Sequence, residues 1–517
     1  MAGCLAAQTQ HPASGGTIVV IPFENRSSAP GLEWIGESFP ELLGQQLSSP
    51  SYFVVPREDR LHAYDRAGIP AGLHPSRATL YRMAEDMGAD YVVLGYYDFD
   101  GRNFTASAQL LNMQVPKLMP EVHESGPLIE LMDIQTALAW DLLQTLRPDS
   151  AIRRQAFLDS APSIRLDAFE NYIRGIIAAS AVERINRFRE AVRISPGYTR
   201  ALLALGKTCF EARQYDQAIL ALAQVSETDP AAREANFYLG LAAYYRGDYD
   251  RASAAFGFVA ARLPLTEVYN NLGVVTARRG KKNAAEYFQK ASDSDPGDPD
   301  YHFNLAIAEC RAGDAQGALR QLRETLSLHP SDAEAQLLLD HISAGGTIRL
   351  QASKLPLERI RSNYNESPFR QLSMQISAVA EQRLSQADPK IHAQFHTDRG
   401  RELLAQGFIS EAEKDLREAI GLDPANAEAH AGLARVLEAD NDPAGARFEA
   451  EAALRLKSFA EPLVVLADLD LRENKEDDAA QSVDQALRLE PASAPALALK
   501  RAIAAKLAEK AQPLPKR

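Results

Sequence analysis

Cysteine is nearly absent from this sequence: Cys4, Cys209 and Cys310 are the three among 517 residues. So few, and an odd number, exclude a disulfide framework, and the lack of a Cys-x-x-Cys pair excludes the usual zinc and thioredoxin-like sites. Long apolar runs are missing too, and a membrane-spanning helix needs about 20 such residues in a row. We therefore expect no transmembrane segment. Cys209 and Cys310 lie in apolar helical stretches and are interpreted as small buried hydrophobic residues.

The sequence also lacks the motifs that carry common chemistry. It has no phosphate-binding Gly-x-x-x-x-Gly-Lys-Ser/Thr loop, no dinucleotide-binding Gly-x-Gly-x-x-Gly after a strand, no Gly-x-Ser-x-Gly and no His-Glu-x-x-His. No group of side chains supplies a nucleophile, a base and a stabilising donor together. We expect a protein that is not an enzyme, with no catalytic residue, no cofactor and no metal.

Three weaker motifs have structural explanations. His392 and His396 share one helix face as a metal pair would, but no third ligand follows at a fixed spacing, so both are interpreted as partly exposed polar residues. The stretch 98–101 (DFDG) resembles part of a calcium loop but lacks the closing glutamate, which favours a hairpin turn. The acidic stretch 293–300 falls between two repeats and is interpreted as helix capping and solubility.

Positive charge is in short supply, since the net charge is −13 at neutral pH. An acidic surface repels phosphate backbones, so nucleic acid is not expected as a partner. The two basic clusters, 278–282 and 354–361, are short, and we interpret each as a solvated helix face.

What the sequence has in abundance is a repeat of about 34 residues. Prolines, small residues and alanines keep this period together across the middle of the chain, which chance does not explain. The prolines stand at 196, 230, 264, 296 and 330, the small residues at 206, 240, 273 and 306, and the alanines at 218, 252, 285 and 318.

Each repeat is interpreted as two helices joined by a short turn. Apolar residues over 200–212 follow the spacing of an amphipathic helix, and a second helix after the turn presents Ala218. Gly206 has no side chain, so we expect it to meet Ala218 where the two helices cross most closely, and Gly240 to meet Ala252 in the same way. Proline then ends the second helix and opens the next repeat.

This pattern resembles the tetratricopeptide-repeat family, whose fold is an all-α superhelix, or α-solenoid. A first array spans 165–342 with about five helical hairpins, the first atypical, and a second array spans 393–491 with three. The arrays are out of phase, so an irregular helical connector is predicted between them, over 343–392. Residues 492–510 are predicted to form a capping helix, and 511–517 a tail.

The first third of the chain does not repeat, and strands alternate there with helices. The predicted strands are 17–21, 52–55, 91–94 and 104–111, and the predicted helices are 32–47, 76–87 and 128–146. This order favours an α/β or α+β domain over 16–148. We expect a cut near 149–160 to separate it from the repeats. Residues 1–15 are either disordered or the remnant of an export signal.

Several short stretches of this domain resemble the amino-terminal domain of TolB-type periplasmic proteins and the related CsgG-like and FlgO-type envelope domains of bacteria. They are 20–25 (VIPFEN), 32–37 (LEWIGE), 54–57 (VVPR) and 88–93 (GADYVV). The resemblance implies a bacterial protein in the periplasm or peripherally associated with the envelope, and binding rather than catalysis. A cytoplasmic location is expected instead if Met1 is the true start.

In tetratricopeptide stacks the first helix of each repeat lines a concave groove. The residues predicted to line it here are Phe237, Leu241, Tyr244, Tyr245, Asn270, Asn271, Phe303 and Asn304. Asn271 and Asn304 match a position that resembles the family's peptide-contacting asparagine, and a side-chain amide can donate to and accept from one backbone unit. Ordinary repeat residues with no ligand are the simpler explanation of the same pattern.

These observations favour a non-enzymatic protein-interaction adaptor or scaffold, associated with the cell envelope, that binds peptides of other proteins in the groove. A cytoplasmic regulatory or assembly scaffold is the alternative, and an enzyme with an unrecognised site is a third. Because a repeat fold does not specify its ligand, the identity of the partner stays open.

Overall fold

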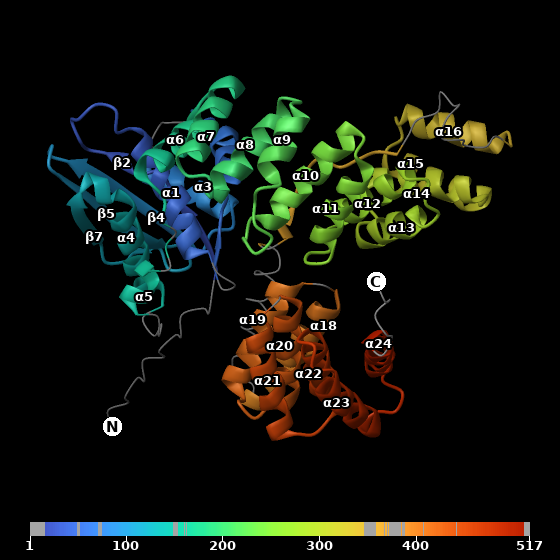
Figure 1. Cartoon of the computed structure of the whole chain (residues 1–517). Coiled ribbons are helices and arrows are strands. Elements are labelled where there is room, and N and C mark those ends of the chain that lie inside the picture. The colour runs from blue at the N-terminus through green and yellow to red at the C-terminus, as the bar shows by residue number, and fades with distance from the viewer. Residues whose placement is uncertain are drawn as a thin grey trace, which may run out of the picture. The chain divides into compact units, whose positions relative to one another are not determined.

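The computed structural model describes residues 16–48, 52–70, 75–147, 153–159, 161, 163–345, 358–366, 368–369, 371, 384, 388–406, 408–440 and 442–510. The predicted terminal stretches 1–15 and 511–517 lie outside these ranges. The chain forms two compact units, one of residues 1–261 and 265–379, the other of 262–264 and 380–517. The first begins with an α/β region and continues as helical hairpins, and the second is helical (Figure 1).

One mixed sheet forms the α/β region. Its strands are β1 Gly16–Val20, β2 Glu24–Asn25, β3 Tyr52–Val54, β4 Tyr91–Phe99, β5 Asn103–Asn112, β6 Lys117–Leu118 and β7 Val122–Pro127. The order is β3-β1-β4-β5-β6, with β2 also on β4 and β7 also on β5. β1 runs parallel to β3 and β4, whereas β4 and β5 are antiparallel. The hairpin turn expected at 98–101 is confirmed between β4 and β5, where Asp100 accepts the N–H groups of Arg102 and Asn103.

Both faces of the sheet are covered because β1 alternates its apolar side chains between them. Ile18 and Val20 pack under α1 (Trp34–Leu47) and α4 (Leu131–Leu146), while Val19 and Ile21 pack with α2 (Arg57–Arg66) and α3 (Arg77–Asp86). Ser76 caps α3 by accepting the N–H of Thr79 at 3.2 Å. A short 3₁₀ turn, Leu128–Glu130, precedes α4, and α5 (Arg154–Asp159) follows it.

Paired antiparallel helices form both repeat arrays. The first array contains α6 Leu166–Ile177, α7 Ala181–Ile194, α8 Thr199–Glu211, α9 Tyr215–Leu222, α10 Ala232–Arg246, α11 Tyr249–Ala260, α12 Thr266–Arg278, α13 Ala284–Ser294, α14 Pro299–Ala312, α15 Ala315–Leu328 and α16 Ala333–Ser343. The second contains α18 Pro389–Gln406, α19 Ile409–Leu422, α20 Ala427–Ala439, α21 Pro443–Leu456, α22 Ala460–Arg472 and α23 Glu476–Leu489, followed by α24 Ala494–Lys510. Helical hairpins thus occur in both arrays, and one further helix follows the second.

The small residues of the repeats face large neighbours, which differs from the expected pairing with alanine. A Cβ atom added at Gly240 would lie 2.8 Å from the ring of Phe256, and one added at Gly206 would lie 2.3 Å from Leu222. Ala252 and Ala218 are also fully buried, one turn earlier on the same helices. The glycines therefore make room for a large side chain of the partner helix.

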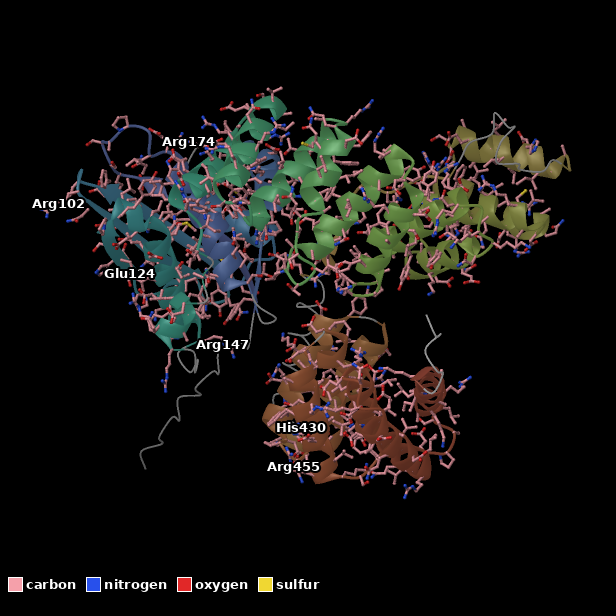
Figure 2. All side chains as sticks on the ribbon, in the orientation of Figure 1. Arg102, Glu124, Arg147, Arg174, His430 and Arg455 are labelled. Carbon is pink, nitrogen blue, oxygen red and sulfur yellow. The ribbon has the colours of Figure 1, made fainter. Side chains whose placement is uncertain are left out.

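The α/β region and the first repeat share one hydrophobic core, so the predicted boundary near 149–160 does not divide the packing. The rings of Trp34 and Phe169 meet edge to face with centroids 6.3 Å apart. Tyr172 donates its hydroxyl to Glu41 at 2.9 Å, and Arg174, labelled in Figure 2, donates to the carbonyl of Gly31 at 3.0 Å.

The predicted helical connector, 343–392, needs correction in its described part. Residues 358–365 form no helix, strand or turn; with Glu366 they make up the docked segment, which runs along the first array in gold in Figure 1. Its neighbours Pro368, Phe369 and Gln371 are helical, while residues 372–379 of the predicted connector lie outside the described residues. The segment lacks helix because its backbone bonds to side chains of the array.

Candidate peptide-binding groove

Two asparagines of the first array hold the backbone of the docked segment. The side-chain oxygen of Asn304 accepts the N–H of Arg359, and its amide donates to the carbonyl of the same residue, both at 2.7 Å. Asn271 forms the same two hydrogen bonds with the backbone of Arg361, both at 2.8 Å. Alternate residues of an extended chain thus have both backbone polar groups satisfied by one amide each.

Asn270 connects these two contacts. It donates to the carbonyl of Arg359 at 2.9 Å, and its side-chain oxygen accepts the amide of Asn304 at 2.7 Å. All three asparagines are fully buried. Because buried amides are costly unless bonded, this network is stable only with an extended backbone in place.

Arg359 lies in an acidic pocket at the first turns of α14 and α16. Its guanidinium bonds to Asp300 and Asp332 at 2.7 Å and to Glu334 at 2.9 Å, and its central carbon lies 3.7 Å from the ring centroid of Phe303. The hydrogen bond from Arg359 holds the pKa of Asp332 below its ordinary value. Asp332 also caps α16 by accepting the N–H of Ala335 at 3.0 Å.

Arg361 lies beside the first pocket. It pairs with Asp298, which caps α14, and with Asp300 at 3.0 Å, and its guanidinium faces the ring of Tyr301 at 5.2 Å. The acidic turn 293–300 therefore does cap a helix, as predicted, and it also binds an arginine. The basic cluster 354–361 was interpreted as a solvated helix face, and for Arg359 and Arg361 that interpretation is wrong.

The remaining side chains of the segment are also enclosed. Glu358 is buried between Arg278, at 3.3 Å, and Arg311. Arg278 belongs to the other basic cluster, 278–282, so it too is not simply solvated. Ile360 packs on the apolar cluster that contains Val274 and Leu305.

At its far end the segment reaches α10 and α12. The N–H of Asn365 donates to Glu267 at 2.7 Å, and burial raises the pKa of that carboxyl. The ring of Tyr364 lies 5.1 Å from that of Phe237, and Glu366 pairs with Arg233 at 2.7 Å.

The structure brings most of the predicted groove residues together. Asn270, Asn271, Asn304, Phe237 and Phe303 contact the docked segment through the bonds and ring contacts given above. The other three predicted groove residues lie in other surroundings. Tyr244 packs on the same apolar cluster as Ile360, Leu241 is fully buried in α10, and Tyr245 is 47% exposed and stacks on Tyr215 with ring centroids 5.2 Å apart.

The charged residues of the groove were missed at the sequence level. They are Arg233, Glu267, Arg278, Asp298, Asp300, Arg311, Asp332 and Glu334. Their positions gave the available signal. Asp298 and Asp332 cap the first helices of successive repeats, α14 and α16, and the start of such a helix lies at the edge of the groove. Their partners follow in the sequence only after a gap in the repeat pattern, so charge pairing could not be inferred.

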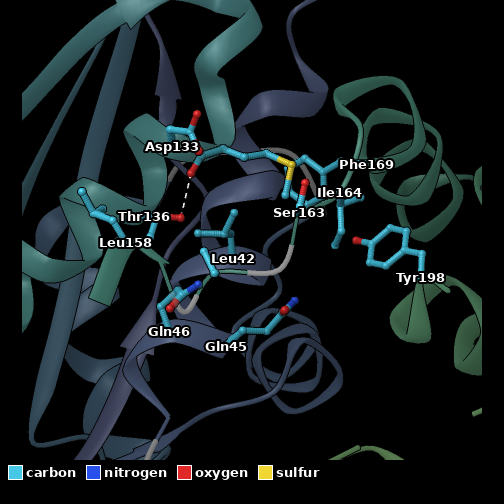
Figure 3. A pocket seen from close by; sticks show the side chains of 12 residues that line it. Leu42, Gln45, Gln46, Asp133, Thr136, Leu158, Ser163, Ile164, Phe169 and Tyr198 are labelled. Atoms are coloured by element: carbon cyan, nitrogen blue, oxygen red, sulfur yellow. Dashed lines mark hydrogen bonds between the residues drawn. The ribbon is translucent and has the colours of Figure 1, made fainter. Parts of the chain in front are cut away.

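Among its described residues, the first unit has a larger cavity beside the end of the docked segment and a smaller one whose lining includes no residue of that segment. The larger, about 580 Å³, lies between α1, α2, α6, α7, α8 and α10, and Tyr364 and Glu366 form part of its wall. Lys207 bonds to Glu234 there at 2.6 Å, and burial raises the pKa of Glu41. The smaller, about 150 Å³, is lined by side chains of α1 and α4 and by Leu158, Ala161, Ser163, Ile164, Phe169 and Tyr198 (Figure 3). It marks the junction of the α/β region with the repeats.

The histidine pair of the second unit has a structural role. The rings of His392 and His396 lie 4.9 Å apart, and His396 is buried and bonded through Nδ1 to Asp415 at 2.8 Å, so it is not partly exposed as expected. Among the side chains that the structure describes, no three His, Cys, Asp or Glu residues gather as a metal site would require. Within the same ranges, no helix is both long and apolar enough to cross a membrane.

Comparison with known protein families identifies the repeats. Two family profiles, each described as tetratricopeptide repeat, match residues 239–299 with 397–461 and residues 179–236 with 282–342. No curated protein sequence matches the chain.

Solved structures that resemble parts of it include YrrB, described as a TPR protein with an unusual peptide-binding site (16% identity, 34% of this chain and 92% of that one, TM-score 0.32). MamA from Desulfovibrio magneticus RS-1 resembles it at 21% identity, over 33% and 99% of the two chains, with a TM-score of 0.31. The LpoB C-terminal domain from Salmonella enterica resembles it at 15% identity, over 22% and 84%, with a TM-score of 0.20. The profile matches fall on helical hairpins of both units, and the chain is therefore a protein with tetratricopeptide repeats in each of its two arrays.

Proposed function

We propose that this protein is a non-enzymatic adaptor whose first array binds an extended segment of a partner protein. The observation that carries the proposal is the paired hydrogen bonding of Asn271 and Asn304, each of which donates to and accepts from one residue of the docked segment. This geometry recognises an extended backbone as such. Any chain that can adopt it satisfies the same four bonds.

The magnitude of these contacts suits peptide binding. Loss of one buried amide contact costs about 1–3 kcal/mol, or up to roughly a hundredfold in affinity. The equivalent positions of the second array, set by its repeat spacing, are Asp398, Gly432 and Val465, which offer no amide. The proposal therefore assigns peptide binding to the first array.

Selection from a library of short peptides tests this function. The bait is the full chain with Arg359→Ala and Arg361→Ala, which weakens the hold of the docked segment. We expect selected peptides to lose at least tenfold in affinity when Asn271→Ala and Asn304→Ala are added. Asn236→Ala is the matched control, because that amide bonds to Ala232 of its own helix. If no selected peptide responds to the asparagine changes, the groove is not the binding site.

We also propose peripheral association with the bacterial envelope. The support is the likeness of 20–25, 32–37, 54–57 and 88–93 to envelope domains; these stretches form or adjoin β1, α1, β3 and β4 of the sheet. Fractionation of cells that make the tagged protein from its native gene tests the location. Recovery in the cytosolic fraction alone contradicts it and favours a cytoplasmic scaffold.

A further inference from the structure

The docked segment occupies the groove as a bound peptide would. Its backbone is held by amides, so its side chains decide which sequences fit. Four consecutive side chains enter different surroundings: Glu358 lies between two arginines, Arg359 in the acidic pocket, Ile360 on an apolar cluster and Arg361 beside Asp298 and Asp300.

The acidic pocket is matched to a guanidinium. Arg359 uses both terminal nitrogens, reaching Asp300, Asp332 and Glu334, and its flat face lies on Phe303. A lysine has a single ammonium, which cannot form the paired bonds to Asp332 or stack in the same way. Arginine is therefore specified here, and acidic side chains are repelled.

Arg361 and Glu358 extend this selection in both directions along the chain. Two residues on, Arg361 meets Asp298 and shares Asp300 with Arg359, and this is the spacing at which side chains of an extended chain share one face. Glu358 neutralises Arg278 and Arg311, so an uncharged residue at that position would leave both cations without a carboxylate.

The segment is tethered to the groove it fills. A covalent tether typically gives an effective concentration on the order of millimolar, which a free competitor must overcome. Residues 358–366 therefore compete with any partner for the same amides and carboxylates.

We propose that the groove selects a partner segment with the pattern acidic–Arg–apolar–Arg, and that residues 358–366 hold its place until that partner displaces them. This inference rests on the proposed function and names the chemistry of its ligand. The partner is a protein that presents an extended, arginine-rich segment, which suits the acidic balance of this chain.

A labelled peptide with the sequence of residues 358–366 (ERIRSNYNE) tests the proposal by fluorescence anisotropy. We expect it to bind the full chain with Arg359→Ala and Arg361→Ala at least tenfold more tightly than the wild type. The control is Arg246→Ala with Arg251→Ala, which removes the same charge from exposed ion pairs. A peptide with lysine at both arginine positions should bind at least tenfold more weakly.

Hydrogen exchange on the wild type gives an independent readout that needs no groove variant. The N–H groups of Arg359 and Arg361 are bonded, so they should exchange slowly, and excess peptide, labelled with heavy isotopes, should accelerate them severalfold. Unchanged exchange, or equal affinity for wild type and variant, overturns the competition. Equal affinity for the lysine peptide overturns the arginine selection.

The remaining outcomes separate this inference from the function beneath it. Tight peptide binding that ignores Asn271→Ala with Asn304→Ala overturns the proposed function as well. A concentration-dependent dimer of the wild type in sedimentation velocity, abolished by the same two changes, assigns the groove to a second copy of this chain and overturns the proposed partner.

Discussion

A buried amide is stable when each of its polar atoms has a partner. Asn270, Asn271 and Asn304 meet that condition through one another and through the backbone of the docked segment. Glu358 is buried as well: its side chain has no exposed surface, and its charge is neutralised by two arginines. Each of these residues is therefore stable only while its partners stay in place.

Replacement of Glu358 should loosen the docked segment. Glu358→Gln leaves Arg278 and Arg311 without a carboxylate, and loss of one partner from a buried ion pair costs roughly 3 kcal/mol or more. Trypsin should then cleave after Arg359 at least tenfold faster than in the wild type, with cleavage after the hairpin residue Arg102 as reference. Glu324→Gln, an exposed change on α15, is the control. Equal cleavage rates in wild type and Glu358→Gln would contradict the role of this pair.

A carboxyl of the second unit should give a pH-dependent stability. Burial, reinforced by the Asp468 carboxyl on α22, raises the pKa of Glu438 on α20 to about 7, against the opposing charges of Arg472 and Arg435. The folded state thus binds this proton more tightly than the unfolded chain. Its contribution to stability is complete below the ordinary pKa of 4.5 and is lost as the pH rises through about 7.

Glu438→Gln should therefore raise the melting temperature of the second unit at about pH 8 by a few degrees and flatten its dependence on pH. Differential scanning calorimetry across that range measures the effect. Glu418→Gln, an exposed carboxyl on α19, should leave the slope unchanged. A wild type whose stability rises between about pH 6 and pH 8 would show the opposite sign.

Within a hairpin, the fit of glycine against a large side chain sets the distance between the two helices. Gly240→Ala should destabilise the first unit by roughly 1–3 kcal/mol, because the new Cβ would lie 2.8 Å from the ring of Phe256. Phe256→Leu in the same chain should recover part of the loss. Chemical denaturation measures both.

Gly257→Ala on α11 is the matched control for that change. Its Cβ would have no neighbour within 4 Å, so removal of a helical glycine should stabilise by about 0.5–1 kcal/mol. Destabilisation of similar size at both sites would mean that helix propensity, and not packing, governs the hairpin.

The hairpins were predictable because proline, glycine and alanine repeat with their period, and periodicity reports which face is buried. β7 was not, because Val122–Pro127 is an edge strand with alternating half-buried and exposed residues and no apolar run. Asn271 and Asn304 were found from their place in the repeat. Their occupant was not, because Arg359 lies 55 residues beyond Asn304 and no periodic signal connects them.

The boundary between the compact units of the molecule does not coincide with the change in its sequence pattern. The pattern changes near residue 150, yet Trp34, Phe39, Leu138 and Phe169 belong to one continuous core. Hydrophobic contacts join the α/β region to the first array. Sequence periodicity does not reveal such contacts, because they connect a sheet domain to helical repeats. The division between compact units falls instead near residue 380.

Two fragments should show this division. Residues 16–379 are expected to melt as one cooperative unit, since their core is continuous, and residues 380–517 are expected to fold separately. Residues 16–148 alone should be destabilised, because Trp34 loses Phe169 and Glu41 loses Tyr172. Calorimetry and near-ultraviolet circular dichroism on the three fragments check this. A sharp, independent transition for 16–148 would restore the boundary suggested by the sequence.

The course of the docked segment also has a mechanical consequence. Neighbouring repeats of a solenoid touch only each other, so such a stack bends and stretches like a spring. Residues 358–366 run lengthwise across it, fastened to Asp332 on the α16 side and to Arg233 on α10. Because it is bonded at both ends, this segment restricts changes in the curvature of the helical repeats between those two points. A pulling force on the first array would therefore act on the bonds of residues 358–366 before the repeats could straighten. Without this segment the array would stretch more easily.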